Sequence, residues 1–211
     1  EHLCDLEHID AIANVSLMKE IQDVFSQVDM PVSRLYEVTK NNACDKMLLF
    51  ADNKNTPRFS FIFAENGRNA LTTWTLTLTY LYFSPGVPII YQGSEVPMYG
   101  PKFPENQLMY DPISADPDLE KMFIRLASAR EQFPPLVHGD FEQIATDQGF
   151  SLFKRTYNDE TVYFAINNDS ESRVVVLDDI DENLQLRGLF HDDTIRATED
   201  GKFYVGLPRE S

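Results

Sequence analysis

The hydrophobic pattern predicts two short buried strands, each followed directly by polar residues. The first apolar run, Met47–Phe50, leads into Asp52–Asn55, and the second, Val87–Tyr91, leads into Gln92–Glu95. Continuous apolar runs of this length are typical of strands that are buried on both faces of a parallel sheet. In α/β barrels the functional groups lie at the carboxyl ends of the strands, which is where these polar residues fall. We therefore expect the two runs to be neighbouring parallel strands with a site at their ends.

Helical patterns surround these strands. A short apolar run at Ile9–Asn14 predicts a further strand, and Ser16 is a suitable N-cap for a helix after it. Val32–Lys40 predicts a second, weaker helix. Farther along the chain, Asp116 followed by Pro117 is a typical helix start. The buried face of the first of these helices would be formed by Leu17, Ile21, Val24, Phe25 and Val28.

The segment Ala70–Phe83 fits two structures equally well. Its threonines alternate with apolar residues, which favours a strand, because β-branched residues at period two suit a half-buried sheet. The same segment also carries a helical stripe, formed by Leu71, Trp74, Leu78, Leu81 and Tyr82. The pattern alone leaves strand and helix open here.

From Phe141 onward the pattern becomes that of an all-β domain. Short apolar and aromatic runs alternate with turn clusters such as Asn158-Asp159 and Asp200-Gly201. This spacing is typical of an antiparallel sandwich. The runs that predict strands are Phe150–Tyr157, Val162–Asn167, Val174–Leu177, Leu184–Phe190 and Phe203–Leu207.

Charge and composition limit the class of partner. The chain of 211 residues has a formal net charge of −16, which argues against nucleic acid or an anionic membrane as partner. No run of apolar residues is long enough to span a membrane. The two cysteines, Cys4 and Cys44, allow a single bridge, but two buried free thiols are the preferred interpretation. The histidines lack ligand spacing and no phosphate-binding glycine loop occurs, so we expect no metal and no cofactor.

Two motifs resemble the α-amylase family of glycoside hydrolases, family thirteen. FADNKNTPRF is similar to the motif of that family's seventh barrel strand, and SPGVPIIYQGSE to that of its eighth. The resemblance implies an α/β plus all-β fold, in which the C-terminal part of a TIM (β/α)8 barrel precedes a small antiparallel β-sandwich. It places the barrel units in residues 1–139 and the sandwich in residues 140–211. It also implies that Ala70–Phe83 is a barrel helix.

The resemblance assigns roles to the residues after Met47–Phe50. Asn53 matches the family's Asn, Lys54 stands where the family has a substrate-contacting His, and Asn55 stands where it has a transition-state-stabilising Asp. An amide offers no negative charge to a developing oxocarbenium ion, so Asn55 is a substituted catalytic position. Retaining glycoside hydrolysis needs two carboxyl groups, which the family carries on its fourth and fifth strands. Those strands would precede Glu1, so we expect this chain to lack the nucleophile and the general acid.

Three further positions carry two interpretations each. Arg58 would contact sugar or Asp52, but the preferred interpretation is a position in a solvated turn or a surface ion pair, because these are the commoner environments of such a residue. Tyr91 would stack on a sugar ring, although barrel filling is the commoner role for such a residue. Asn106-Gln107 resembles an Asn-Arg pair of the family with its Arg replaced. The candidate substrate-binding residues are therefore Asn53, Lys54, Arg58 and Tyr91.

The resulting functional hypothesis is part of an α-amylase-family hydrolase acting on α-glucosidic bonds of starch-like glucans. Its expected partners are an oligo- or polysaccharide of α-linked glucose and either the N-terminal half of the barrel or a protein that covers the open strand edges. The alternative is a catalytically inactive amylase-like protein, used for interaction, as in the heavy chains of amino-acid transporters, or for carbohydrate binding. The substitutions at Lys54 and Asn55 make that alternative credible.

Overall fold

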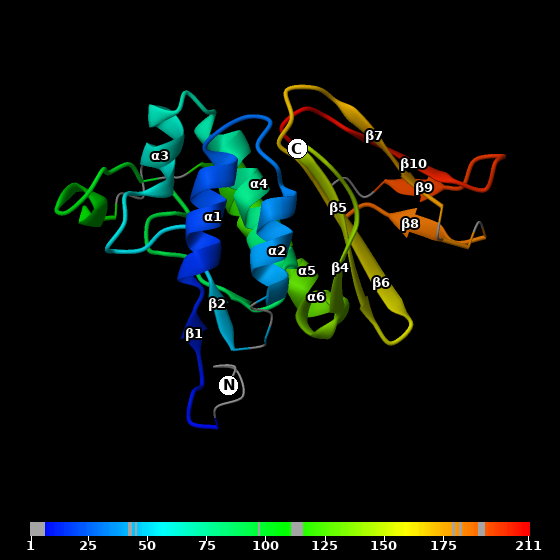
Figure 1. Cartoon of the computed structure of the whole chain (residues 1–211), viewed down its shortest axis with the longest axis horizontal. Coiled ribbons are helices and arrows are strands. Elements are labelled where there is room, and N and C mark those ends of the chain that lie inside the picture. The colour runs from blue at the N-terminus through cyan, green and yellow to red at the C-terminus, as the bar shows by residue number, and fades with distance from the viewer. Residues whose placement is uncertain are drawn as a thin grey trace.

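The chain folds into an α/β part followed by an antiparallel β part, as Figure 1 shows for a computed structural model. The structure describes residues 7–41, 44, 46–96, 98–110, 116–178, 180–181, 183–189 and 193–211. The two parts lie against each other, with the helices packed on one face of the antiparallel sheet of residues 140–167 and the later strands, within residues 173–207, on the other. This arrangement agrees with the expected α/β plus all-β class.

The α/β part contains a parallel sheet of three short strands. These are β1 (Ile12–Ala13), β2 (Met47–Leu49) and β3 (Val87–Pro88), in the order β1-β2-β3. Both pairs are parallel, with Leu48 opposite Val87 in the second. The prediction of two neighbouring parallel strands is therefore confirmed. Within the described residues the sheet is open, so its assignment to part of a barrel stays a prediction.

Six helices and a 3-10 turn are described around this sheet. Asn14, and not Ser16, caps the first helix, because its side chain accepts a hydrogen bond from the backbone N–H of Leu17. Val28 lies beyond the end of that helix and is partly exposed, so its assignment to the buried face is wrong. The elements are α1 (Val15–Phe25), α2 (Ser33–Asn41), α3 (Phe59–Glu65), α4 (Ala70–Phe83), η2 (Glu105–Gln107), α5 (Pro117–Gln132) and α6 (Pro135–His138).

The ambiguous segment is a helix, α4, and its threonines are compatible with that. The hydroxyls of Thr73, Thr75, Thr77 and Thr79 each donate to the carbonyl four residues earlier, which satisfies these groups inside the helix. Nine of its fourteen residues are buried, on all sides of the helix. A helix buried all round has no single apolar stripe, which is why the sequence pattern alone left this segment undecided.

Among its described residues, the β part contains three antiparallel sheets. Their orders are β4-β5-β6, β10-β7 and β8-β9. The sequence pattern missed β4 and β9, because both are largely exposed and carry few apolar residues. The strands are β4 (Asp140–Asp147), β5 (Phe150–Tyr157), β6 (Glu160–Asn167), β7 (Arg173–Leu177), β8 (Gln185–Arg187), β9 (Thr194–Arg196) and β10 (Phe203–Leu207).

A continuous aromatic core joins the two parts. Tyr80 and Phe83 of α4 meet Phe153 of β5 and Phe164 of β6 at ring-centroid distances of 5.3–6.5 Å. Phe141 of β4 stacks on Phe153 at 5.5 Å. Edge-to-face and offset contacts of this kind stabilise beyond the area they bury. The helices and the β4–β6 sheet therefore share one core.

The structure also bears on the state of the cysteines and on membrane-spanning helices. Cys44 is disulfide-bonded, so the preference for free thiols is wrong at this position, while Cys4 lies outside the described residues. In the part of the chain that is described, every helix is too short or too polar to cross a membrane.

Candidate functional site

The polar segment after β2 folds into a tight turn that exposes two side chains. The Asn53 carboxamide oxygen accepts a hydrogen bond from the backbone N–H of Asn55 over 2.8 Å, and the backbone N–H of Asn53 donates to the Thr56 hydroxyl over 3.1 Å. Asn side chains favour such turns because they replace a backbone partner two residues on. Asn53 itself is half-buried, whereas Lys54 and Asn55 are exposed.

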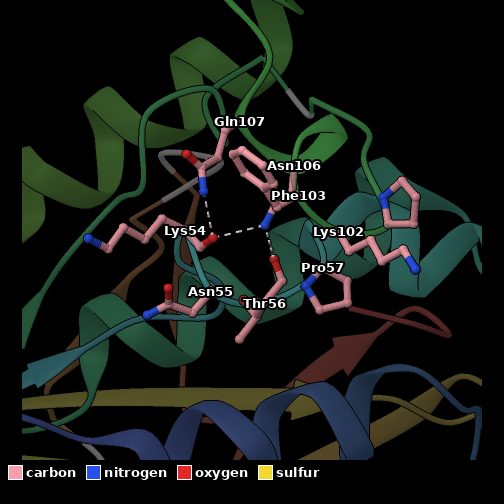
Figure 2. Close-up of a pocket in the computed structure, with 9 residues that line it drawn as sticks. Lys54, Asn55, Thr56, Pro57, Lys102, Phe103, Asn106 and Gln107 are labelled. Atoms are coloured by element: carbon pink, nitrogen blue, oxygen red, sulfur yellow. Dashed lines mark hydrogen bonds between the residues drawn. The ribbon is translucent and has the colours of Figure 1, made fainter.

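The long segment after β3 packs onto this turn through two amides. The Asn106 side-chain amide donates to the backbone carbonyls of Lys54, over 3.0 Å, and Thr56, over 2.8 Å. The Gln107 amide donates to the same Lys54 carbonyl over 3.0 Å. Figure 2 shows these three bonds between the two segments. Because they hold backbone atoms, they fix the turn without using the side chains of Lys54 and Asn55.

A pocket of about 630 Å³ lies between the two segments. It contains amides, two lysines and an apolar wall, and no carboxylate is among the described residues that line it. Figure 2 shows the Lys54 and Lys102 side chains extending toward opposite sides of this pocket. The lining residues are Lys54, Asn55, Thr56, Pro57, Pro101, Lys102, Phe103, Asn106 and Gln107.

A buried polar network supports the turn from within. Asp52 is 3% exposed, and its carboxylate accepts from the backbone N–H of Phe59, over 3.1 Å, and from the Ser94 hydroxyl, over 3.0 Å. The guanidinium Nη1 of Arg58 lies 3.9 Å from the same carboxylate. Burial raises the pKa of Asp52, while the Phe59 hydrogen bond and Arg58 act in the opposite direction. Asp52 therefore joins the start of α3 to the segment after β3.

Arg58 is internal, and the preferred interpretation of a solvated turn or surface ion pair is wrong. It is 2% exposed and donates to the backbone carbonyls of Asn106, over 2.9 Å, and Gln92, over 2.6 Å. Its guanidinium also lies 4.1 Å from the centre of the Tyr91 ring. Arg is suited to this role because its planar fork satisfies several acceptors at once. It thus ties together the segments after β2 and β3.

The structure brings the predicted residues together in two layers. Lys54 and Asn55 line the pocket, while Asn53, Arg58 and Tyr91 lie in the supporting layer. The sequence analysis missed Lys102 and Phe103, which line the pocket from the other side. The only signal for them was the length of the irregular loop after Glu95, since long loops in compact domains are often functional. Among the described residues no group of three or more His, Cys, Asp or Glu could hold a metal ion.

Comparison with a family model places the β part. Residues 139–211 match the family model "Alpha-amylase C-terminal domain". A cyclomaltodextrinase of Thermoanaerobacter pseudethanolicus is 21% identical over 83% of this chain and 31% of its own length.

Solved structures agree with the whole fold. An α-amylase from Anoxybacillus superposes with a TM-score of 0.89 at 36% identity, over 96% of this chain and 46% of that one. The α-amylase of Geobacillus thermoleovorans, solved in complex with acarbose, gives a TM-score of 0.88 at 33% identity with the same coverage. This chain therefore spans less than half the length of these relatives. The agreement of family model, sequence and fold shows that the chain belongs to the α-amylase family of glycoside hydrolases and corresponds to the C-terminal part of its members.

Proposed function

We propose that this chain forms one wall of the α-glucan cleft of an α-amylase-family hydrolase that acts on α-glucosidic bonds of starch-like glucans. The observation that carries the proposal is the pocket at the carboxyl ends of β2 and β3, lined by Lys54 and Asn55. Pockets at this end of parallel strands are where α/β barrels bind their substrates. The Geobacillus thermoleovorans relative was solved in complex with acarbose, which supports a sugar as the class of ligand.

Each predicted residue has a place in this proposal. Lys54 and Asn55 donate hydrogen bonds to sugar hydroxyls, and Asn55 occupies the substituted position of the family's transition-state-stabilising acid. Asn53 holds the turn through its bond to the Asn55 N–H. Arg58 and Tyr91 act through their mutual stacking beneath the pocket. Their contribution to substrate binding is the positioning of the two segments that carry the pocket.

The domain division proposed is residues 1–139 for the last β/α units of a barrel and residues 140–211 for the β-sandwich. The parallel order β1-β2-β3, with helices between the strands, supports the barrel units. The start of the family-model match at residue 139 supports the division.

This chain by itself is proposed to lack the nucleophile and the general acid. No carboxylate occurs among the described residues that line the pocket, and Asn55 cannot supply one. Asp52 is close in sequence, but its carboxylate is buried and already accepts two hydrogen bonds. A retaining mechanism needs two free carboxyl groups about 5 Å apart. The reaction would therefore depend on groups supplied from outside this pocket.

A partner is proposed to cover the open edge of the parallel sheet. β3 is the last strand of that sheet within the described residues, and Val87 and Ile89 beside its edge are more than 40% exposed. Ile124 on α5 is 59% exposed. Exposed edges with apolar residues favour pairing with another strand. The N-terminal half of a barrel, or a covering protein, would supply that strand.

Titration calorimetry with maltotetraose tests the proposal, alongside an assay for release of reducing ends. We expect the chain to bind the sugar without hydrolysing it, and the double variant Lys54→Ala/Asn55→Ala to bind it at least about tenfold more weakly, on the scale of lost hydrogen bonds to the ligand. Asn183→Ala is the matched control, because Asn183 is an exposed Asn of the β part. Hydrolysis by the chain alone would contradict the proposal that it lacks the general acid and the nucleophile. Absence of sugar binding would contradict the proposal that the pocket is part of a glucan cleft.

The second candidate is a catalytically inactive interaction or carbohydrate-binding protein. It is favoured by the exposed Lys54 and Asn55, which replace the residue types that the resemblance associates with turnover. Hydrolysis of maltooligosaccharides after the chain is joined to an N-terminal half with both carboxylates distinguishes the two. Turnover supports the hydrolase, and binding without turnover supports the inactive protein.

A further inference from the structure

The pocket has the opposite charge to the rest of the protein. The chain contains 34 acidic and 18 basic residues. Nevertheless the described lining of the pocket includes Lys54 and Lys102 and no acidic residue. Glu105 belongs to the same loop but is not among the lining residues. A positive pocket in a strongly acidic protein attracts an anionic ligand against the overall field.

Both ammonium groups are available to a ligand. Lys54 and Lys102 are exposed, and within the described part of the chain neither forms an ion pair with a carboxylate. The hydrogen bonds that hold Lys54 use its backbone carbonyl and leave its side chain free to turn toward a ligand. Lys121, by contrast, is an exposed lysine that is paired with Asp118 over 3.0 Å.

The remaining lining residues suit a sugar ring. Phe103 is 71% exposed and forms an apolar wall with Pro57 and Pro101. An exposed aromatic face beside amide donors is typical of sites that stack a sugar and bond its hydroxyls. Asn55 and Gln107 supply the amides. The pocket thus combines an apolar wall, neutral donors and two cations.

We infer that this pocket binds an α-glucan that carries a phosphate monoester, with the Lys54 ammonium group donating to the phosphoryl oxygens. A phosphate monoester carries nearly two negative charges at neutral pH, and Lys serves proteins as a point charge for such groups. Asn55 donates to the same group or to an adjacent hydroxyl, and Lys102 adds to the positive potential from the opposite side (Figure 2). This inference rests on the proposed glucan cleft and specifies its substrate class.

Calorimetry with three probes tests the inference on the full chain. The probes are maltotetraose, maltotetraose 6-phosphate and inorganic phosphate, each titrated at low and at high salt. We expect the phosphorylated sugar to bind about tenfold more tightly than the neutral one, and the ratio to fall as salt is raised. Lys54→Gln should abolish most of this preference, and Lys102→Gln part of it. Lys202→Gln, in the β9–β10 turn, is the charge-matched control and should leave the ratio unchanged. A thermal melt of each variant verifies folding.

The results with the three probes distinguish failure of the phosphate assignment from failure of the proposed glucan cleft. Equal binding of both sugars, or a preference that survives Lys54→Gln, overturns the phosphate assignment and leaves the glucan cleft standing. Inorganic phosphate that binds as tightly as the phosphorylated sugar also overturns it, since the glucan would then contribute nothing. Absence of binding by all three probes overturns both.

Discussion

Arg155 of β5 donates a hydrogen bond from its guanidinium to the main-chain carbonyl of Phe83, the last residue of α4, over 2.7 Å. The same side chain is fully buried and also donates to the carbonyls of Leu136, Gly139 and Asp140. One cation therefore satisfies the ends of two helices and the start of β4. Several buried hydrogen bonds therefore hold the β part and the helices together at this point.

Replacing this cation should destabilise the whole chain. We expect Arg155→Met to lower the free energy of unfolding by about 3 kcal/mol or more, because several buried carbonyls lose their donors. Urea denaturation followed by circular dichroism measures the change. Arg209→Met, at an exposed position near the C-terminus, should change the value by less than about 0.5 kcal/mol. Equal effects of the two substitutions would contradict the role given to Arg155.

Asn168 should be the second fixed point between the two parts. Its amide is fully buried, donates to the carbonyls of Val24 and Gln27, and accepts from Arg68 over 2.7 Å. Asn168→Ala should cost about 2–4 kcal/mol of unfolding free energy, since it leaves these groups unpaired. A double-mutant cycle with Arg68→Ala should give a coupling above about 0.5 kcal/mol. Additive effects would show that the bond contributes nothing.

Gly86 should tolerate no side chain at the entry to β3. Its φ is +118°, and a Cβ atom there would lie 2.7 Å from the Met47 carbonyl oxygen, a backbone atom that cannot move aside. Gly67 also has a positive φ, of +69°, but nothing lies within 4 Å of its Cβ position. We expect Gly67→Ala to cost about 1 kcal/mol, for the backbone conformation alone. Gly86→Ala should cost clearly more in the same urea titration, and equal losses would contradict the steric argument.

The buried Asp52 should make stability fall as pH rises. Burial raises its pKa above 3.8, so the folded state binds the proton more tightly than the unfolded state does. Its stabilising contribution is then complete below about pH 4 and is lost as pH rises through the folded-state pKa. Relative to Asp52→Asn, the wild-type free energy of unfolding should decrease as the pH rises above about 4. The difference in unfolding free energy between the two proteins isolates the contribution of Asp52. Parallel pH profiles of the two proteins would contradict the prediction.

The fold could be predicted wherever a short segment is buried on one or both faces, because such burial leaves a pattern of apolar residues in the sequence. Leu48 and Val87 were expected on neighbouring parallel strands and are paired. β4 escaped prediction because most of its residues face solvent, so no apolar run marks it. The boundary of β3 also differs, since hydrogen bonding stops soon after Pro88 although the apolar run continues to Tyr91.

The candidate site was predictable in its strand-end residues and not in its loop residues. Lys54 follows a recognisable strand, whereas Phe103 lies in a segment without periodicity. Arg58 illustrates the limit most clearly. A charged residue beside a turn is usually solvated, but here the segment after β3 folds over it and supplies two carbonyl acceptors. No local pattern carries that information, because the acceptors are more than thirty residues away.

The sequence by itself predicted the buried strands at Met47–Phe50 and Val87–Tyr91 and the region where the β part begins. Through its resemblance it also predicted that Lys54 and Asn55 stand in place of a His and an Asp. Only the tertiary structure decided that Arg58, Arg155 and Asn168 are interior, and that Lys54 and Lys102 share one pocket. The physical reason is that burial of a polar group depends on partners distant in sequence. Apolar periodicity is local, whereas the satisfaction of a buried charge is not.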